Sequence, residues 1–153
     1  MLFRSERIDF LKEMCIRDSR NAVRMSNDLP YRVSRGTLGE LLAQAYLLAH
    51  GVQAAPPIRD SGNDLIACRG RELRTLQVKT RKGYNFSKNG LPRIYDGLIF
   101  VVLKEDDSRF GETKPDLFLL SRTELENAAS LGKAVLADFR LSTERVADFF
   151  ASA

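Results

Sequence analysis

The sequence holds few of the residues that build the commonest metal and nucleophile sites. Its 153 residues include one histidine, His50, and two cysteines, Cys15 and Cys68, which lie far apart. A structural zinc site needs about four ligands, mostly from His and Cys, so such a site is excluded. A Ser-His-Asp triad would have to use His50, which instead ends an apolar helical run just before Gly51, a common place for a histidine.

The chain also lacks the segments that mark nucleotide-binding, secreted and membrane proteins. Neither G-x-G-x-x-G nor G-x-x-x-x-G-K-[ST] occurs in it. The apolar runs are too short to span a bilayer, and the N-terminus has no apolar signal-peptide core. Together with the two unpaired cysteines, these absences predict a cytoplasmic protein without a membrane partner.

What the chain does contain is an ordinary globular composition with a small excess of positive charge. Hydrophobic residues make up 44% and charged residues 29%, which excludes disorder, and the net charge is +4. We expect residues 31–153 to form a single domain and residues 1–30 to be an N-terminal extension. Part of that extension is expected to be non-native, because residues 14–19 (MCIRDS) look like translated sequencing-adapter read-through.

The apolar pattern predicts an α/β fold. Leucines and alanines at helical spacing predict a helix with Thr37 as its N-cap, Glu40 completing a capping box and Gly51 just past its end. Short strands are expected at residues 52–55, 64–68, 73–79, 97–103 and 116–120. Two more helices are expected, the first capped by Ser121 or Thr123 and the second by Ser142 or Thr143. This order predicts a central mixed sheet flanked by helices.

The most specific local prediction is a β-hairpin. A two-residue turn at Gly70-Arg71 suits a glycine-first hairpin between the second and third expected strands. In that register Asp64 lies opposite Gln77. Alternation along the strands then places Asp64, Gln77 and Lys79 on one face, while the intervening apolar residues point toward the core.

Four polar side chains thereby meet at one candidate site: Glu40 on the helix, Asp64 at a strand start, and Gln77 with Lys79 on the next strand. Oxygen ligands suit Mg²⁺, which keeps several waters and needs few protein ligands. The expected ligands are the Asp64 carboxylate, the Gln77 side-chain carbonyl, the main-chain carbonyl of Val78, and Glu40 directly or through water. Lys79 would orient the attacking water or stabilise charge on a phosphate.

With these residues the chain resembles the PD-(D/E)xK nuclease superfamily, in particular its small homing endonucleases with a Q-x-K motif and the archaeal Holliday junction resolvases. The matching residues are, in order, Arg35-Gly36, Gly39-Glu40, Gly51-Val52, Pro56, 63–66 and 76–80, so the resemblance covers about residues 35–120. It implies a restriction-endonuclease-like core and a Mg²⁺-dependent DNA endonuclease, with Mn²⁺ as a substitute. It also implies catalytic roles for Glu40, Asp64, Gln77 and Lys79.

Two departures from the family pattern bear on activity. Asn63 stands where a proline is loosely kept, and Gln77 replaces an acidic residue. Because a neutral amide oxygen binds Mg²⁺ more weakly than a carboxylate does, we expect one bound metal rather than two. A catalytically inactive nucleic-acid-binding or assembly domain on the same fold is therefore an alternative, as is a metal-free protein-interaction module.

Each site residue also has an ordinary structural interpretation. Glu40 could serve only the capping box, and Asp64 could simply end a turn after Gly62-Asn63. Gln77 and Lys79 could belong to the solvated face of a strand. The nuclease interpretation therefore depends on whether the fold brings the four residues together.

The positive charge is concentrated next to the candidate site. Residues 69–93 hold eight basic residues and one acidic residue, so this segment carries +7 and the rest of the chain −3. Phosphate contacts supply most nucleic-acid affinity, which makes DNA the expected partner. The expected contacts are Arg74, Arg81, Lys82, Lys88 and Arg93. Tyr84 would stack on or wedge between bases, or tuck back onto the sheet. Cutting both strands needs two sites, which predicts a homodimer or homotetramer.

Overall fold

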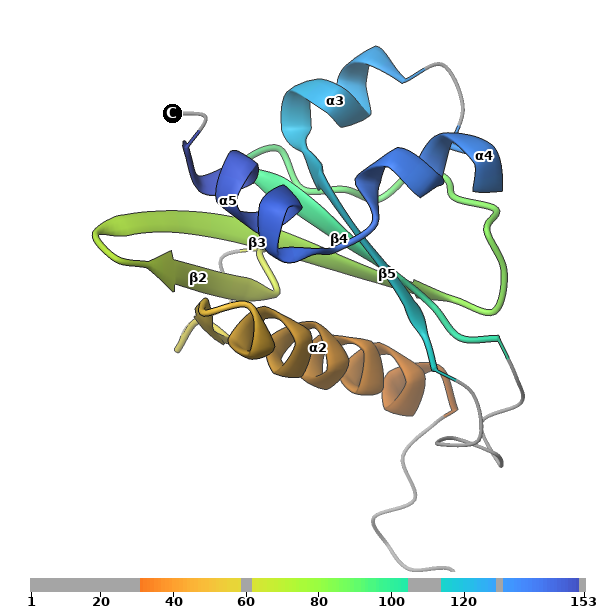
Figure 1. Cartoon of the computed structure of the whole chain (residues 1–153). Helices are drawn as coiled ribbons and strands as arrows, with labels where there is room; N and C mark the ends of the chain where they lie inside the picture. The colour runs from red at the N-terminus through yellow and green to blue at the C-terminus, as the bar shows by residue number, and fades with distance from the viewer. Residues whose placement is uncertain (1–30, 59–61, 105–113, 129–130, 152–153) are drawn as a thin grey trace, which may run out of the picture. The chain divides into compact units, whose positions relative to one another are not determined.

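The computed structural model describes residues 31–58, 62–104, 114–128 and 131–151 (Figure 1). In chain order the elements are helix α2 (Tyr31–Ala49), strands β1 (Gln53–Ala55), β2 (Leu65–Arg69), β3 (Glu72–Arg81), β4 (Gly97–Val102) and β5 (Asp116–Ser121), helices α3 (Arg122–Asn127) and α4 (Lys133–Leu136), the short 3₁₀ helix η2 (Ala137–Phe139) and helix α5 (Thr143–Ala151). Residues 1–30 lie outside the described residues, so the expected N-terminal extension stays a prediction. Within the described ranges, no helix has the length and apolar character needed to cross a membrane.

The five strands form one open sheet in the order β1-β2-β3-β4-β5. Neighbouring strands are antiparallel except β3 and β4, which run parallel, so the chain returns between them through residues 82–96. The predicted α/β fold with a mixed sheet flanked by helices is confirmed. Ser121 caps α3, and the Ser142 hydroxyl accepts a hydrogen bond from the first turn of α5. Of the two residues proposed to cap each helix, the serine is therefore the one that does so. The short α4 and η2 were not predicted.

The predicted hairpin register is confirmed where the strands pair. Leu65 lies opposite Leu76, and Gly70 in the turn has φ +63°, a conformation that glycine adopts without steric cost. The ladder ends there, however, because the Asp64 main-chain N–H donates to the Leu76 carbonyl at 3.1 Å. Asp64 therefore reaches Gln77 through its side chain and not through strand pairing.

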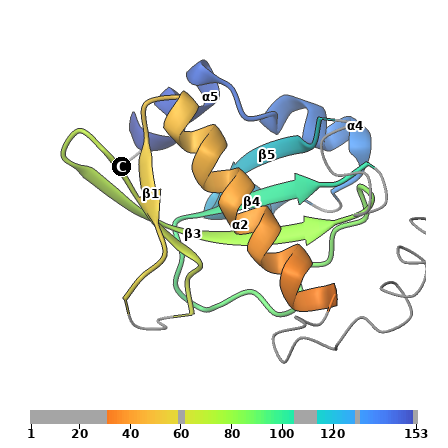
Figure 2. The ribbon, with the colours of Figure 1, turned by 90° about the horizontal axis from the view of Figure 1, so that it is seen from below.

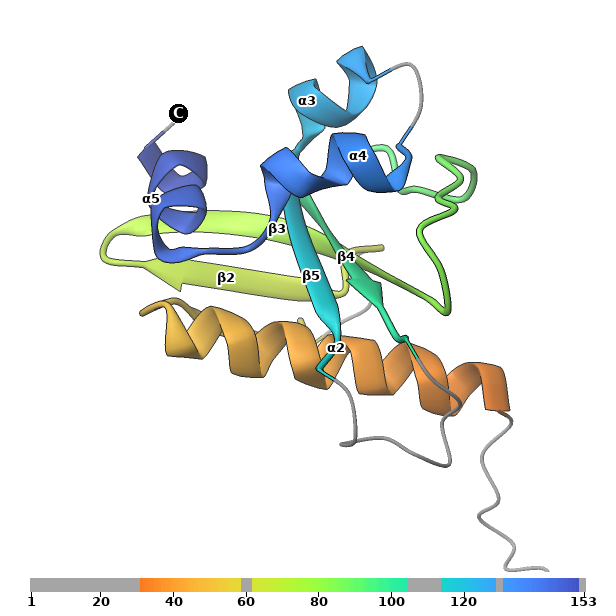
Figure 3. The same ribbon diagram turned by 45° about the vertical axis from the view of Figure 1, so that its right-hand side comes forward.

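Two apolar clusters lie on opposite faces of the sheet. Val78 and Ile99 belong to the first cluster, together with side chains of α2 and α5. Leu98 belongs to the second, with α3, α4 and part of the 82–96 segment. Alternation along β3 therefore directs Val78 toward α2, whereas Gln77 and Lys79 point to the other face. Figure 2 shows α2 lying across the sheet, and Figure 3 shows α3 and α4 on the far side from α2.

Helix α2 is longer than the sequence pattern indicated, and the predicted capping box is wrong. The described helix begins at Tyr31, six residues before Thr37. Thr37 and Glu40 therefore lie inside the helix, where the main-chain N–H groups already have helical partners. Glu40 has no capping role, which removes the structural alternative for this residue.

Gly39 lets α2 approach β3 closely. A Cβ atom at this position would lie 1.8 Å from Thr80 Oγ1, far inside van der Waals contact. At Gly36, one turn earlier, such a Cβ would meet nothing within 4 Å. The close approach at Gly39 brings the next helical residue, Glu40, near enough to Asp64 for their charges to interact.

Candidate functional site

Asp64 is the centre of the candidate site. Its Oδ2 accepts a hydrogen bond of 2.7 Å from the Val78 main-chain N–H, and the same oxygen accepts one from Gln77 Nε2. The pairing of β2 with β3 ends at Leu76, and the Asp64 carboxylate accepts the next outward-facing main-chain N–H of β3, that of Val78. The structure thus brings Asp64, Gln77 and Val78 into direct contact.

The main-chain carbonyl of Val78 is directed to the same place. In a β-strand, the N–H and the C=O of one residue point toward the same neighbouring strand. Since the Val78 N–H bonds to Asp64, the Val78 carbonyl lies on the Asp64 side of β3. Val78 can therefore offer a main-chain oxygen beside the Asp64 carboxylate while its side chain packs in the core.

Gln77 holds a buried acceptor without a partner. Its side chain is 6% exposed, and although Nε2 donates to Asp64, Oε1 has no hydrogen-bond partner among the described residues. The Oδ1 atom of Asn63, the residue before Asp64, is buried and unpartnered in the same way. A buried acceptor left unsatisfied costs about 1–3 kcal/mol, so these oxygens favour a water molecule or a cation.

Glu40 brings a second carboxylate toward Asp64. Burial raises the pKa of the Glu40 carboxyl above its ordinary value, and the negative charge of Asp64 raises this pKa further. Two carboxylates that oppose each other's ionisation gain from a cation placed between them, because the positive charge relieves their repulsion. Glu40 and Asp64 therefore have the electrostatic relation expected of two ligands to one ion.

Lys79 shares a face of β3 with Gln77 but bonds to a different part of the chain. Its Nζ donates to the main-chain carbonyl of Gly90 at 3.2 Å. Gly90 belongs to the segment that connects β3 to β4. The ammonium group is therefore fastened to that segment, two residues along the strand from the Asp64–Gln77 contact.

The donors at the site are mixed oxygen ligands. Among the residues that the structure describes, no three His, Cys, Asp or Glu side chains gather in a group that could hold a metal ion. The candidate donors are the Asp64 carboxylate, the Glu40 carboxylate whose charge interacts with it, and the amide oxygen of Gln77 and the carbonyl of Val78, two residues that hydrogen-bond to Asp64. Mg²⁺ accepts oxygen ligands of these kinds and retains several waters, so the residues present fit this ion.

The predicted nucleic-acid contacts are divided between the two faces of the sheet. Arg74 lies on the α5 face, where its Nη2 donates to the Phe150 carbonyl at 3.5 Å. Arg81 is exposed and follows Lys79 on the opposite face by strand alternation. Lys82 and Arg93 are exposed as well. The basic segment 69–93 is therefore not one surface, and Arg74 lies apart from the rest of the site.

Two of the residues expected to contact DNA, Tyr84 and Lys88, instead bond to other parts of the protein and hold the 82–96 segment in place. Tyr84 Oη donates to Asp116 Oδ2 at 2.5 Å, and its ring meets Phe118 edge-on, with 6.2 Å between centroids. Lys88 Nζ donates to the Ala128 carbonyl, past the end of α3, at 2.6 Å. Of the two alternatives for Tyr84, the ring tucked back onto the sheet is the observed one, and Lys88 is engaged within the protein.

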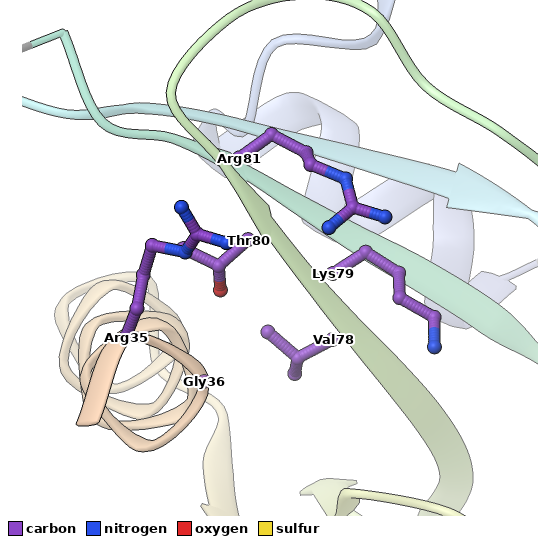
Figure 4. Close-up of a pocket in the computed structure, with 6 residues that line it drawn as sticks. All are labelled: Arg35, Gly36, Val78, Lys79, Thr80 and Arg81. Atoms are coloured by element: carbon purple, nitrogen blue, oxygen red, sulfur yellow. The ribbon is translucent and has the colours of Figure 1, made fainter. Parts of the chain in front are cut away.

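A groove of about 410 Å³ lies between α2 and the end of β3. Its lining residues are Arg35, Gly36, Val78, Lys79, Thr80 and Arg81. Figure 4 shows Arg35 and Thr80 on the α2 side of β3, with Lys79 and Arg81 projecting to the other side. Sequence reasoning did not include Arg35 among the candidate contacts, although the Arg35-Gly36 pair ahead of Glu40 was a signal for it.

Comparison of the chain with protein-family models, with curated proteins and with solved structures gives no match. The chemistry of the site therefore has to be judged from its own residues.

Proposed function

We propose that the chain is a metal-dependent DNA endonuclease with a restriction-endonuclease-like core of the PD-(D/E)xK type. The single observation that carries the proposal is the buried Gln77 Oε1 without a partner, next to the Asp64 carboxylate. An acceptor in that position is explained by a cation that it helps to bind. The order of Glu40, Asp64, Gln77 and Lys79 along the chain supports the same family.

The residues divide the work between binding the ion and handling the substrate. Mg²⁺, or Mn²⁺ in its place, would be held by Asp64, Gln77, the Val78 carbonyl and Glu40, the last directly or through water. When bound, such an ion polarises a phosphodiester and activates a water molecule. Asp64 also fixes Val78 through its N–H, which holds the neighbouring carbonyl in place. Lys79 would orient the attacking water or stabilise charge on the phosphate.

DNA is the proposed substrate because exposed cations follow directly on the site. Arg81 and Lys82 extend from the end of β3, beyond the ligands on the same strand. Positive charge beside a hydrolytic centre draws the phosphodiester backbone to it. Cutting both strands of a duplex requires two such centres, so a homodimer or a homotetramer belongs to the proposal.

A non-catalytic nucleic-acid-binding domain on the same fold is the second candidate. Two observations favour it: Gln77 is a neutral ligand, and Lys79 is bonded to the Gly90 carbonyl. Such a domain would bind DNA in a salt-sensitive way. It would show neither cleavage nor a metal-induced rise in Tm, because a ligand raises Tm only when the folded state binds it.

Cleavage assays with matched variants test the proposal. The protein is incubated with supercoiled, branched and single-stranded DNA, with Mg²⁺ or Mn²⁺ and without either ion. We expect nicking only with metal, and a loss on the order of 10²-fold or more in Asp64→Ala and Lys79→Ala, since the first removes a proposed metal ligand and the second removes the group proposed to orient the water or stabilise charge on the phosphate. Arg71→Ala, in the exposed hairpin turn, is the control and keeps the wild-type rate. Cutting by both site variants at that rate, or no cutting by wild type, contradicts the proposal.

A further inference from the structure

The second half of β3, residues 77–81, has no described strand paired to the edge that faces away from β4. β2 pairs with β3 only as far as Leu76, whereas β3 continues to Arg81 and keeps β4 on its other side. The Arg81 carbonyl accepts from the Leu103 N–H on the β4 side, so the N–H and C=O groups of Val78 and Thr80 point the opposite way. Asp64 takes the Val78 N–H. The next main-chain N–H along this edge is that of Thr80.

The groove beside this edge is lined by positive charge on both sides of β3. Arg35 lies on the α2 side of the strand, and the side chains of Lys79 and Arg81 project from the other side (Figure 4). None of the six lining residues is acidic. Arg35 beside a main-chain donor that faces no described strand, with two more cations on the other side of that strand, suits a phosphate group of a polyanion.

The groove adjoins the candidate metal centre. Val78 belongs to both, because its N–H bonds to Asp64 and it also lines the groove. A strand rises about 3.3 Å per residue, so Thr80 lies roughly 7 Å beyond Val78. A nucleic-acid strand held at the metal centre could therefore continue along β3 into the groove.

We propose that this α2–β3 groove binds a backbone phosphate of the DNA strand that the metal centre engages, with Arg35 as its main cation and the Thr80 main-chain N–H as a donor. The inference rests on the proposed function, because DNA is taken as the substrate. Arg35 is then a substrate-binding residue that sets the position of the strand and takes no part in the chemistry. Gly36 leaves this part of the groove wall without a side chain. A Cβ placed there would meet nothing within 4 Å, so the position can be substituted without a clash.

DNA affinity measured by fluorescence anisotropy over a range of salt concentrations, without divalent metal, tests the groove separately from catalysis. We expect Arg35→Ala to weaken binding several-fold and to reduce the slope of log K against log salt by about one, as loss of one phosphate contact does. Gly36→Glu places a negative charge in the groove and is expected to weaken binding at least as much. Gly36→Ala is expected to bind as wild type does.

The two glycine variants separate charge from folding, because both replace glycine with a better helix former at an unobstructed position. Arg71→Ala removes an exposed arginine outside the groove and should leave the affinity within twofold of wild type. Wild-type affinity in Arg35→Ala and Gly36→Glu, an equal loss in Arg71→Ala, or no DNA binding by wild type overturns the groove assignment. A protein that binds DNA through Arg35 but never nicks it in Mg²⁺ overturns the nuclease instead and leaves the groove standing.

Discussion

At the scale of single residues, Glu40 ionises at a cost in this fold. Burial and then the charge of Asp64 raise the pKa of its carboxyl above the value it has in the unfolded chain. A raised pKa in the folded state means that the neutral form is favoured there. The contribution of Glu40 to stability is therefore fully present below its unfolded pKa and is lost as the pH rises through its folded pKa.

Replacing Glu40 with glutamine should consequently stabilise the protein when no metal is present. At pH 7 in EDTA we expect Glu40→Gln to raise Tm by roughly 2–4 °C, and we expect the gain to vanish near pH 4, where the wild-type carboxyl is protonated. With Ca²⁺ or Mg²⁺ the order should reverse, since the wild type gains a carboxylate ligand. Thermal unfolding at two pH values, with and without metal, checks both parts. A lower Tm for Glu40→Gln at pH 7 in EDTA would mean that Glu40 is stabilising without a cation.

Residue types and spacing select the candidate oxygen donors, but they do not predict the surroundings of these donors. Asp64 and Gln77 stand out by residue type and hairpin spacing, both of which are local. The burial of Gln77 Oε1 without a partner depends on what packs against its own face of the sheet, and the approach of Glu40 to Asp64 depends on how α2 packs against β3. Packing of that kind is decided by side chains far apart in sequence, so no local pattern predicts it.

At the scale of elements, the contact between α2 and β3 depends on Gly39. A methyl group at this position would collide with the Thr80 side chain. We expect Gly39→Ala to lower the free energy of unfolding by about 1–3 kcal/mol, the usual cost of overpacking, although alanine is the better helix former. Gly36→Ala, in the same helix, should raise it by up to about 1 kcal/mol. Urea unfolding of the two variants measures both.

A second substitution tests whether the collision with Thr80 is the cause. Thr80→Ala removes Oγ1 and Cγ2, two of the three atoms that the added methyl group would meet. The double variant should therefore recover part of the stability that Gly39→Ala loses. If Gly39→Ala unfolds at the same urea concentration as wild type, α2 does not lie as close to β3 as the structure places it.

The hairpin was predicted from local signals, whereas the start of α2 and the attachment of the 82–96 segment were not. The hairpin register follows from Gly70 and strand alternation, which lie within a few residues of one another. The capping motif at Thr37 was wrong because helical structure continues through it back to Tyr31. The attachment of Lys88 to the Ala128 carbonyl joins residues far apart in the chain, and charge counting cannot reveal it.

At the scale of the whole described unit, sequence charge and surface charge differ. The segment 69–93 carries +7 in the sequence, yet β3 directs Arg74 to one face of the sheet and Lys79 and Arg81 to the other. Arg35, which lies outside this segment, joins the groove from α2. Among the described residues, the positive charge beside this groove therefore comes from two elements, α2 and β3, and the segment 69–93 does not form one positive surface.

Asp116, at the start of β5, ties several of these parts together. Its carboxylate accepts hydrogen bonds from Tyr84 and Arg140 and pairs with Lys104 at 3.1 Å, while the side chain is 5% exposed. Burial alone would raise the pKa of Asp116, but the hydrogen bonds from Tyr84 and Lys104 and the charge of Arg140 outweigh it and hold this pKa below its ordinary value. Stability from Asp116 is therefore present above its unfolded pKa and is lost as the pH falls through its folded pKa.

Neutralising this carboxylate should affect the described unit as a whole, because the carboxylate connects the 82–96 segment, the end of β4, β5 and the residue after η2. We expect Asp116→Asn to lower the free energy of unfolding at pH 7 by about 2–4 kcal/mol, and Tyr84→Phe, which removes only the hydroxyl, by about 1–2 kcal/mol. As the pH falls toward 3 the difference between wild type and Asp116→Asn should shrink, since wild type then loses the same charge. Urea unfolding at pH 7 and pH 3 measures these values. An equal loss at both pH values would mean that Asp116 acts through packing and that its charge does not hold the segment to the sheet.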